Sequence, residues 1–292
     1  MRVAFLGTPE AAAVSLRAIV DAGHDVAIVV TRPDKRRGRH EPPRPSPVKA
    51  AALELGLPVS HRAEDVLGTD AELGVVVAFG RIIKAEVLDH LPLVNAHFSL
   101  LPRWRGAAPV ERAILAGDTI TGVCLMAIDE GLDTGPVYRC EEVPIGPEET
   151  APELRERLAV LAARMLVDAL ARGLGPARPQ EGPGTYAEKI EPVDLFLDWR
   201  RPAAELHRVV RLGRAWTTWR DRRLLVLAAQ VTVTQDTGAP TGGPAGRLVG
   251  DVVITGEGGL RLVTVQPEGR APMAAADWLR GARPGTAERL GS

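Results

Sequence analysis

The sequence predicts an α/β protein in two parts, a doubly wound parallel sheet followed by a small β-barrel. Two observations lead to this fold class. As far as residue 171, buried apolar runs alternate with helical stretches, which is the pattern of repeated β-α-β units. Later in the chain, one helical stretch is followed by several short strand-like runs that only turn residues separate.

A β-α-β unit opens the chain. Residues 2–6 predict a buried strand, which Gly7-Thr8-Pro9 ends. Glu10–Ala22 predicts a helix that stops at Gly23, and Val26–Thr31 predicts the next strand. Further strands are predicted at Gly74–Phe79, Leu93–Ala96 and Val123–Ile128, and helices around Val48–Leu55, Lys84–Leu88, Val110–Ala116 and Ala151–Ala171.

The second part begins after a Gly- and Pro-rich stretch, residues 173–184, which is typical of a linker. Ala203–Leu212 then predicts a helix. Strands are predicted at Leu224–Leu227, Val231–Thr234, Gly246–Val249, Val252–Thr255 and Leu260–Val265. We therefore expect a Rossmann-like catalytic domain over residues 1–176, a linker over 177–195 and an OB-like domain over 196–292.

Composition limits the function classes. The 292 residues carry a formal net charge of -1, so the total charge gives no sign of a nucleic-acid partner, although it can hide local basic patches. The two cysteines, Cys124 and Cys140, are too few for a disulfide scaffold or a zinc site, and we expect both in the core. Neither a signal peptide nor a membrane span is predicted, which favours a cytoplasmic protein.

The turn after the first strand argues against a nicotinamide dehydrogenase. The segment Gly7–Ala12 does not have the G-x-G-x-x-G pattern of dinucleotide sites. Pro9 also removes a backbone donor at the point where a pyrophosphate would need one.

Asn95 and His97 follow the apolar run that starts at Leu93. With the period of two of a strand, both side chains point to the same side, at the end of a parallel strand where open α/β sheets place their ligands. An amide can donate to an oxyanion, and an imidazole can act as acid or base near neutral pH. The alternative interpretation is an Asn turn beside a structural histidine.

A second polar segment, Asp129–Gly135, contains three acidic residues and two glycines behind another apolar run. We expect it at a matching strand end, so that Asp133 meets the first segment. The alternative is a solvated turn. A calcium loop fits poorly, because the ligand spacing differs from that of an EF-hand.

The stretch NAHFSLLPRWRGAAPVERAILAGDTITGVCLMAIDEGLDTGPVY resembles the 10-formyltetrahydrofolate-dependent formyltransferase family. The resemblance implies the catalytic residues Asn95, His97 and Asp133 and no metal. It also implies a formyl donor, 10-formyltetrahydrofolate, bound by two sets of residues. The first is the loop Ser99-Leu100-Leu101-Pro102, and the second comprises Phe79, Gly80, Asp129 and Gly131.

Other motifs resemble the branch of that family that formylates methionyl initiator tRNA. They are Gly7-Thr8-Pro9-Glu10, Arg32-Pro33-Asp34, Pro45-Ser46-Pro47-Val48-Lys49, Trp104-Arg105-Gly106-Ala107-Ala108-Pro109, Tyr186-Ala187-Glu188-Lys189-Ile190 and Arg270–Gly281. The resemblance runs nearly end to end. It implies initiator methionyl-tRNA as partner and a monomer.

Two basic runs support a tRNA partner. Residues 32–49 hold seven basic residues against two acidic ones, and residues 200–223 hold eight arginines against two acidic residues. Such runs suit a phosphate backbone, although a solvated face is the alternative for either one. In the first run we expect tRNA contacts from Lys35, Arg36, Arg37 and Arg39.

Some positions depart from the family pattern. Between His61 and Gly74 the chain is short, and Arg81 and Lys84 stand where the family has other residues, beside the expected folate site. Two alternatives therefore stay open. One is formyl transfer to a small amine, such as an amino sugar nucleotide or glycinamide ribonucleotide, and the other is a catalytically diverged RNA-binding paralogue.

Overall fold

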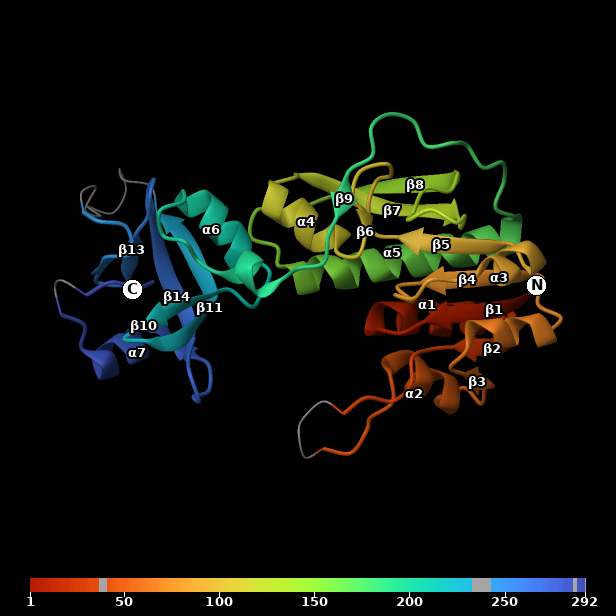
Figure 1. Ribbon diagram of the computed structural model, residues 1–292, viewed down its shortest axis with the longest axis horizontal. Coiled ribbons are helices and arrows are strands. Elements are labelled where there is room, and N and C mark those ends of the chain that lie inside the picture. Colours follow the sequence, from red (N-terminus) through yellow and green to blue (C-terminus); the bar gives the residue numbers. More distant parts are fainter. Residues whose placement is uncertain (37–40, 233–242, 286–287, 292) are drawn as a thin grey trace. The chain divides into compact units, whose positions relative to one another are not determined.

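The computed structural model describes residues 1–36, 41–232, 243–285 and 288–291. The chain forms two compact units (Figure 1). The first comprises Met1–Val110, Ile120–Pro144 and Leu154–Glu188. The second comprises Glu111–Thr119, Ile145–Glu153 and Lys189–Ser292, so two short segments within the first 176 residues belong to it.

A seven-stranded sheet forms the centre of the first unit, in the order β3-β2-β1-β4-β5-β7-β8. Its strands are β1 (Arg2–Gly7), β2 (Asp25–Val30), β3 (Val59–Ser60), β4 (Leu73–Val77), β5 (Leu93–His97), β7 (Ile120–Ala127) and β8 (Val137–Pro144). The strands from β3 to β5 are parallel. The predicted doubly wound parallel sheet is therefore confirmed.

Helices cover both faces of this sheet, because the strands are apolar on both sides. Ala4 and Leu6 of β1 share a core with the 3-10 helix η1 (Ala63–Gly68) and with α3 (Ala85–His90). The helices α1 (Glu10–Asp21) and α2 (Pro47–Glu54) contact each other beside β1 and β2. Figure 1 shows the longest helix, α5 (Ala151–Arg172), along the sheet, and its later turns lie beside α1.

The edge of the sheet differs from the prediction. β7 runs antiparallel to β5, and β8, which the sequence did not predict, runs antiparallel to β7. The alternation of β8 is weak because all eight of its residues are exposed or half-buried. Cys124 and Cys140 lie opposite each other on these strands and form a disulfide, with Cα atoms 4.1 Å apart. Cys124 is buried as expected, but the expectation for Cys140 was wrong, because this residue is exposed on the edge strand.

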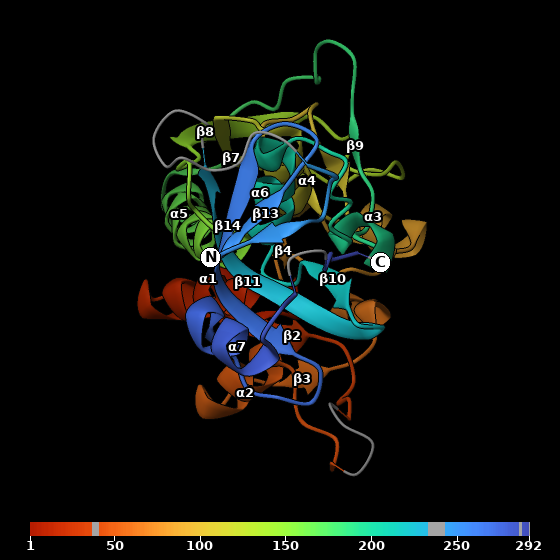
Figure 2. The same ribbon diagram turned by 90° about the vertical axis from the view of Figure 1, so that its left-hand side faces the viewer.

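The second unit is an antiparallel β domain, as predicted. Its strands are β10 (Trp216–Trp219), β11 (Arg222–Thr232), β12 (Leu248–Val249), β13 (Val252–Ile254), β14 (Gly259–Pro267) and β15 (Met273–Ala274). Figure 2 shows β11 and β14 as long, curved strands. Register shifts between Val226 and Ala229 bend this pair, since a bulge increases the local twist.

The core of the second unit lies between the sheet and two helices, α6 (Ala203–Val210) and α7 (Ala275–Ala282). Trp219 and Trp278 meet edge to face in this core, with ring centroids 5.3 Å apart. The first two predicted strands are one strand, β11, up to Thr232, and Val233 and Thr234 lie outside the described residues.

The remaining elements are short. They are α4 (Pro109–Ala116), the two-residue strands β6 (Arg105–Gly106) and β9 (Tyr186–Ala187), and the 3-10 helix η2 (Pro192–Leu195). β6 and β9 pair in parallel and form a small separate sheet of the first unit. In the part of the chain that the structure describes, no helix is both long and apolar enough to cross a membrane.

Candidate active site

β5 carries two polar side chains in a buried strand. Leu93, Val94 and Ala96 are buried, and His97 is only 6% exposed, whereas Asn95 is half-buried. The strand continues to His97, one residue beyond the predicted end. Because side chains alternate along a strand, Asn95 and His97 point to the same side, as the sequence predicted.

Asp133 joins these two residues from another segment. Its Oδ1 lies 3.5 Å from Asn95 Nδ2, and its Oδ2 lies 3.6 Å from His97 Nδ1. The structure therefore brings together the three side chains that the sequence singled out. An amide donor, an imidazole and a carboxylate therefore lie close together, and each of the three side chains is buried or half-buried.

The route of Asp133 to this group differs from the expected one. β7 is antiparallel to β5, so the loop after β7 starts near the beginning of β5 and not at a matching strand end. The loop then brings Asp133 back to His97. Asp133 itself has the left-handed backbone angle φ 52°, and its Oδ2 accepts a hydrogen bond of 2.8 Å from the backbone N–H of Gly106.

The surroundings of His97 determine what its two ring nitrogens can do. Nε2 lies 2.8 Å from the carbonyl oxygen of Trp104, and because a carbonyl only accepts, Nε2 carries the proton. In the neutral ring Nδ1 is then free to accept a proton. The carboxylate of Asp133 beside Nδ1 stabilises the positive ring that results.

The loop Ser99–Pro102 follows directly after β5. Ser99 is completely buried, and its hydroxyl donates to the carbonyl of Arg103 at 2.6 Å. Leu100, Leu101 and Pro102 are half-buried, and the Leu101–Pro102 peptide bond is cis. The hydroxyl of Ser99 thus holds the loop together, and the three residues after it form the accessible part.

The other residues expected at folate lie on two turns. Phe79 is buried after β4, and the exposed Gly80 accepts a hydrogen bond from the guanidinium of Arg32. In the loop after β7, Asp129 Oδ1 accepts from the N–H of Gly131 at 3.1 Å and from the hydroxyl of Thr134 at 2.7 Å. Asp129 therefore shapes the turn that leads to Asp133.

The basic residues Arg81 and Lys84 contact the segment before β4. Arg81 donates to the carbonyl of His61 at 2.7 Å, and Lys84 pairs with Glu64 of η1 at 2.6 Å. The hydrogen bond from Lys84 lowers the pKa of Glu64 below its ordinary value. Lys84 thus fastens η1 to the loop after β4, and Arg81 fastens His61, which lies just before η1, to the same loop.

Three groups at the site were not predicted: the backbone N–H of Gly106, the carbonyl of Trp104 and the side chain of Gln180. Gln180 Nε2 donates to the carbonyls of Asp133 and Gly135, at 2.8 Å each. Backbone groups have no sequence signal, and Gln180 lies in the Gly- and Pro-rich stretch that the sequence marks only as a linker. Among the described residues, no three His, Cys, Asp or Glu side chains are grouped as metal ligands.

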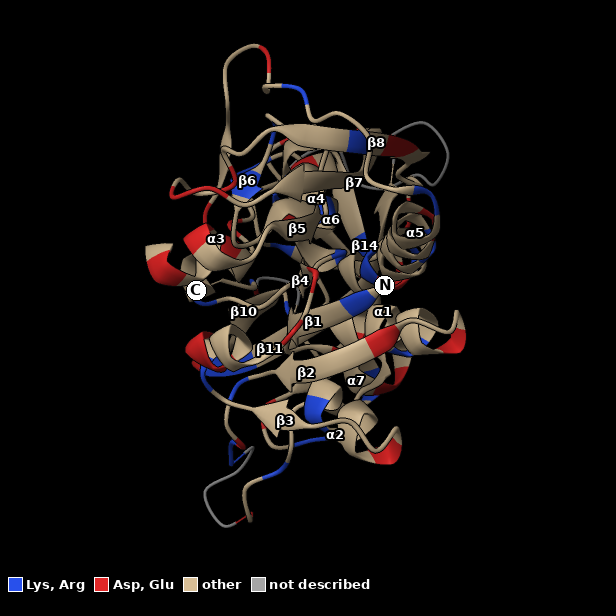
Figure 3. Cartoon of the chain, turned by 90° about the vertical axis from the view of Figure 1, so that its right-hand side faces the viewer, with Lys and Arg blue, Asp and Glu red and all other residues tan. Residues whose placement is uncertain are grey.

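The basic loop of the first unit is described only in part. Lys35 and Arg36 are exposed, and Lys35 pairs through its backbone with Arg44. Arg37 and Arg39 lie outside the described residues. Figure 3 shows basic residues on the stretches of chain that lead to this segment.

The arginine run of the second unit divides into groups with different partners. Arg211 is buried and donates to the carbonyls of Glu149 and Gly146, and burial lowers its pKa. Four exposed arginines pair with acidic residues: Arg200 with Asp198, Arg201 with Glu205, Arg220 with Glu288, and Arg222 with Glu268. Arg214 and Arg223 are exposed and have no acidic ion-pair partner among the described residues.

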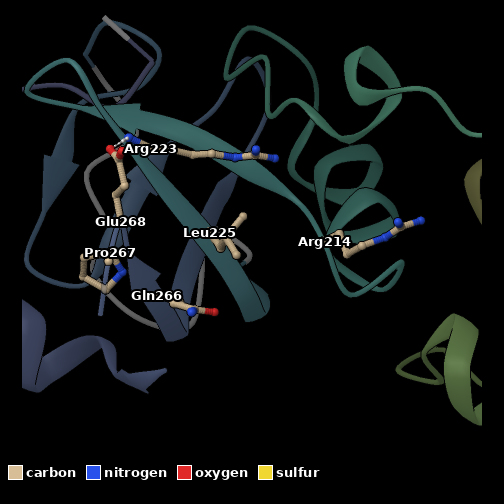
Figure 4. A pocket seen from close by; sticks show the side chains of 7 residues that line it. Arg214, Arg223, Leu225, Gln266, Pro267 and Glu268 are labelled. Atoms are coloured by element: carbon tan, nitrogen blue, oxygen red, sulfur yellow. Dashed lines mark hydrogen bonds between the residues drawn. The ribbon is translucent and has the colours of Figure 1, made fainter. Parts of the chain in front are cut away.

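These two arginines line a pocket of about 280 Å³ on the second unit, which Figure 4 shows from close by. Leu225, Gln266 and Glu268 lie in its wall. The guanidinium of Arg223 also lies over the ring of Trp216, 4.8 Å from the centroid. A guanidinium held by an aromatic face stays available to an anion, because the ring does not neutralise its charge.

An amide donor, an imidazole and a carboxylate that lie together on an open α/β sheet are groups that can stabilise an oxyanion and move a proton. The family models agree with this chemistry. Residues 1–170 match the model described as formyl transferase, and residues 189–283 match the model described as formyl transferase, C-terminal domain. The chain belongs to the formyl transferase family, an enzyme family, and the predicted membership is confirmed.

Individual relatives are similar over nearly the whole chain. A methionyl-tRNA formyltransferase of Symbiobacterium thermophilum is 46% identical over 96% of this chain and 92% of its own length. One from Heliobacterium modesticaldum is 41% identical over the full length of both. An N-formyltransferase structure from Helicobacter canadensis, with folinic acid and dTDP-3-aminofucose, has a TM-score of 0.68 at 19% identity over 91% of this chain and 98% of that one, which shows a shared fold.

Proposed function

We propose that this protein transfers the formyl group of 10-formyltetrahydrofolate to the amino group of methionyl initiator tRNA. The observation that carries the proposal is the meeting of Asn95, His97 and Asp133 from two segments of the first unit. Two relatives that are more than 40% identical over nearly the whole chain are named methionyl-tRNA formyltransferase, which supports tRNA as the acceptor.

In the reaction the amine attacks the formyl carbon, and the bond from that carbon to N10 of the folate breaks. The tetrahedral intermediate carries a negative oxygen, to which the Asn95 amide donates a hydrogen bond. One such donor contributes roughly 100- to 1,000-fold to the rate. Asn95 is suited to this role because its Nδ2 is held beside Asp133 in a half-buried position.

His97 moves the proton. Its Nδ1 takes a proton from the attacking nitrogen, the carboxylate of Asp133 stabilises the charged ring, and the ring gives the proton to N10 as the carbon–nitrogen bond breaks. The products are the formylated amine and tetrahydrofolate, so the atoms balance. Acid–base help of this kind contributes about 100- to 10,000-fold.

We assign the folate to the turns around Phe79–Gly80 and Asp129–Gly131 and to the accessible residues of the Ser99–Pro102 loop. These segments offer backbone groups and apolar side chains, which suit a flat pterin ring. We assign the tRNA phosphates to Lys35, Arg36, Arg37 and Arg39, and further to Arg214 and Arg223 of the second unit. We propose a catalytic domain over residues 1–176, a linker over 177–195 and a tRNA-binding domain over 196–292. We expect the protein to be a monomer. We expect it in the cytoplasm, because charged initiator tRNA is used there.

The acceptor is tested by following the release of tetrahydrofolate from 10-formyltetrahydrofolate. Methionyl initiator tRNA, a dTDP-amino sugar and glycinamide ribonucleotide are supplied in turn, with uncharged tRNA as the control. The proposal expects release with methionyl initiator tRNA alone. Release with a small amine would show that the acceptor is not tRNA. No release with any of the acceptors would contradict formyl transfer and favour an RNA-binding role, which a tRNA-binding assay then measures.

A further inference from the structure

Gln180 makes four hydrogen bonds, two to the main chain around Asp133 and two with Arg105. Its Nε2 donates to the carbonyls of Asp133 and Gly135, each at 2.8 Å. Its Oε1 accepts from Arg105 at both Nε, 3.0 Å, and an Nη atom, 2.7 Å. Because Arg105 only donates, the oxygen of the amide must face it and the NH₂ group must face the two carbonyls, which fixes how the amide points.

Asp133 has a left-handed backbone conformation, which its neighbours must hold in place. Residues other than glycine adopt φ 52° infrequently, and Asp is among those that do so when local hydrogen bonds hold the turn. Gln180 holds the main chain on both sides of Thr134, and the N–H of Gly106 holds the carboxylate. Since Gly106 follows Arg105 directly, the backbone and the side chain of Asp133 are fastened to the same short strand, β6.

The segment that carries Gln180 is itself well anchored. Arg178 exchanges two backbone hydrogen bonds with Val137, of 2.8 and 2.9 Å. The carbonyl of Thr185 accepts from the N–H of Arg105 at 2.8 Å, and its hydroxyl accepts from the N–H of Trp104 at 2.9 Å. Figure 1 shows this stretch leaving α5 and returning to β6 as β9.

Gly184 allows the close approach of Arg105 to this segment. A Cβ atom at Gly184 would lie 2.8 Å from an Nη atom of Arg105, which is closer than real Cβ contacts. The guanidinium can therefore approach the segment closely and reach Gln180. The same arginine is half-buried, so its two donors face Gln180 in place of water.

We propose that Gln180, held by Arg105, is a positioning residue for Asp133, and this inference rests on the proposed function. The hydrogen bonds of Gln180 go to backbone carbonyls and to Arg105, so it does not act on the reacting atoms. It fixes the left-handed turn that presents the carboxylate of Asp133 to Asn95 and His97. A displacement of about 1 Å in such a group costs on the order of 100-fold in rate.

The decisive variant is Gln180→Glu. It keeps the size of the side chain and an acceptor for Arg105, but it places an oxygen against the carbonyls of Asp133 and Gly135. We expect kcat to fall by about 10- to 100-fold, with KM for methionyl-tRNA within about twofold, as for a misplaced catalytic group. The pH dependence of kcat/KM also changes, because the carboxylate no longer lies beside His97. Arg105→Lys removes one of the two donors and gives a smaller decrease of the same kind.

Glu181→Gln is the matched control, since it changes the charge of the exposed neighbouring residue and leaves the amide in place. We expect the rate and pH profile of the unaltered protein. The positioning role is wrong if Gln180→Glu has a kcat within about twofold of normal and an unchanged pH profile. It is also wrong if only the thermal unfolding temperature falls.

A second measurement separates this inference from the proposed function. Hydrogen exchange at the backbone N–H of Gly106, which donates to the Asp133 carboxylate, reports the position of that carboxylate without any substrate. Faster exchange in Gln180→Glu than in Glu181→Gln supports the positioning role even if the unaltered protein does not formylate methionyl-tRNA. Equal exchange in both variants overturns the positioning role whatever the acceptor.

Discussion

The candidate active site of the first unit holds its charged groups in the opposite way from the arginine surface of the second unit, which we define by the exposed Arg214 and Arg223. Asp133 is 17% exposed, and its backbone and carboxylate are fixed by Gly106 and Gln180. Arg214 and Arg223 are exposed and line a wide pocket. Bond-making needs a fixed geometry, whereas attraction of phosphates needs charge more than exact position.

The largest effect is expected where geometry matters most. We expect His97→Ala to lower kcat by about 100- to 10,000-fold and Asn95→Ala by roughly 100- to 1,000-fold, because each removes a group that acts only during the reaction. Tetrahydrofolate release at saturating substrates measures kcat, and thermal unfolding shows that the variants fold. A folded His97→Ala protein with near-normal kcat would refute the assignment.

The next largest effect is expected from a change in the backbone of the loop that carries Asp133. In Gly135→Ala the new Cβ would lie 1.9 Å from the carbonyl oxygen of Ala127, so the loop must move. We expect a decrease of about 1–3 kcal/mol in the free energy of unfolding, together with reduced turnover. Gly68→Ala is the control, since nothing lies within 4 Å of its Cβ position. Equal stability of both variants would show that the loop is less constrained than its contacts indicate.

Substitutions on the arginine surface are expected to lower the affinity for tRNA and to leave kcat nearly unchanged. For Arg214→Ala combined with Arg223→Ala we expect weaker tRNA binding and a salt dependence whose slope falls by about 1 for each phosphate that the variant no longer binds. Arg200→Ala is the control, because its guanidinium already pairs with Asp198 at 2.7 Å. Binding is measured from about 50 to about 200 mM salt, over which such slopes are clear. An equal decrease in the control would mean that the paired and unpaired arginines do not differ.

The smallest effect concerns an exposed ion pair of the second unit. Hydrogen bonds from Arg200 lower the pKa of Asp198 from 3.8 to about 2. Because the folded-state pKa is the lower one, the pair stabilises the fold above pH 3.8, and this contribution disappears as the pH falls towards 2. Its size at neutral pH is at most about 1 kcal/mol, since the pair is screened by water. Unfolding of Asp198→Asn between about pH 2 and pH 6 checks this, and a pH dependence equal to that of the unaltered protein would contradict it.

The fold was largely predictable because most of its elements have strong local patterns. β1, α1 and β2 lie within a residue or two of their predicted bounds, since apolar runs and the breaks at Gly7 and Gly23 mark them. β8 was missed because its exposed, charged residues alternate weakly. Without β8 neither the antiparallel edge of the sheet nor the pairing of Cys140 could be foreseen.

The sequence predicted the three side chains of the site but not the groups that hold them in place. Asn95, His97 and Asp133 stand in recognisable motifs, and the structure groups them. The antiparallel direction of β7 was not visible, so the path of the Asp133 loop was predicted wrongly. The N–H of Gly106 and the amide of Gln180 depend on backbone positions 27 and 47 residues from Asp133, which no local pattern encodes.

We infer that the first unit performs the chemistry and that exposed arginines of the second unit help to bind the acceptor. The most direct test measures initial rates against methionyl-tRNA concentration for the unaltered protein, His97→Ala and the Arg214→Ala/Arg223→Ala double variant in one assay. We expect His97→Ala to lower kcat with little change in KM, and the double variant to raise KM with kcat nearly unchanged. A normal kcat in folded His97→Ala, or a decrease confined to kcat in the double variant, would contradict it.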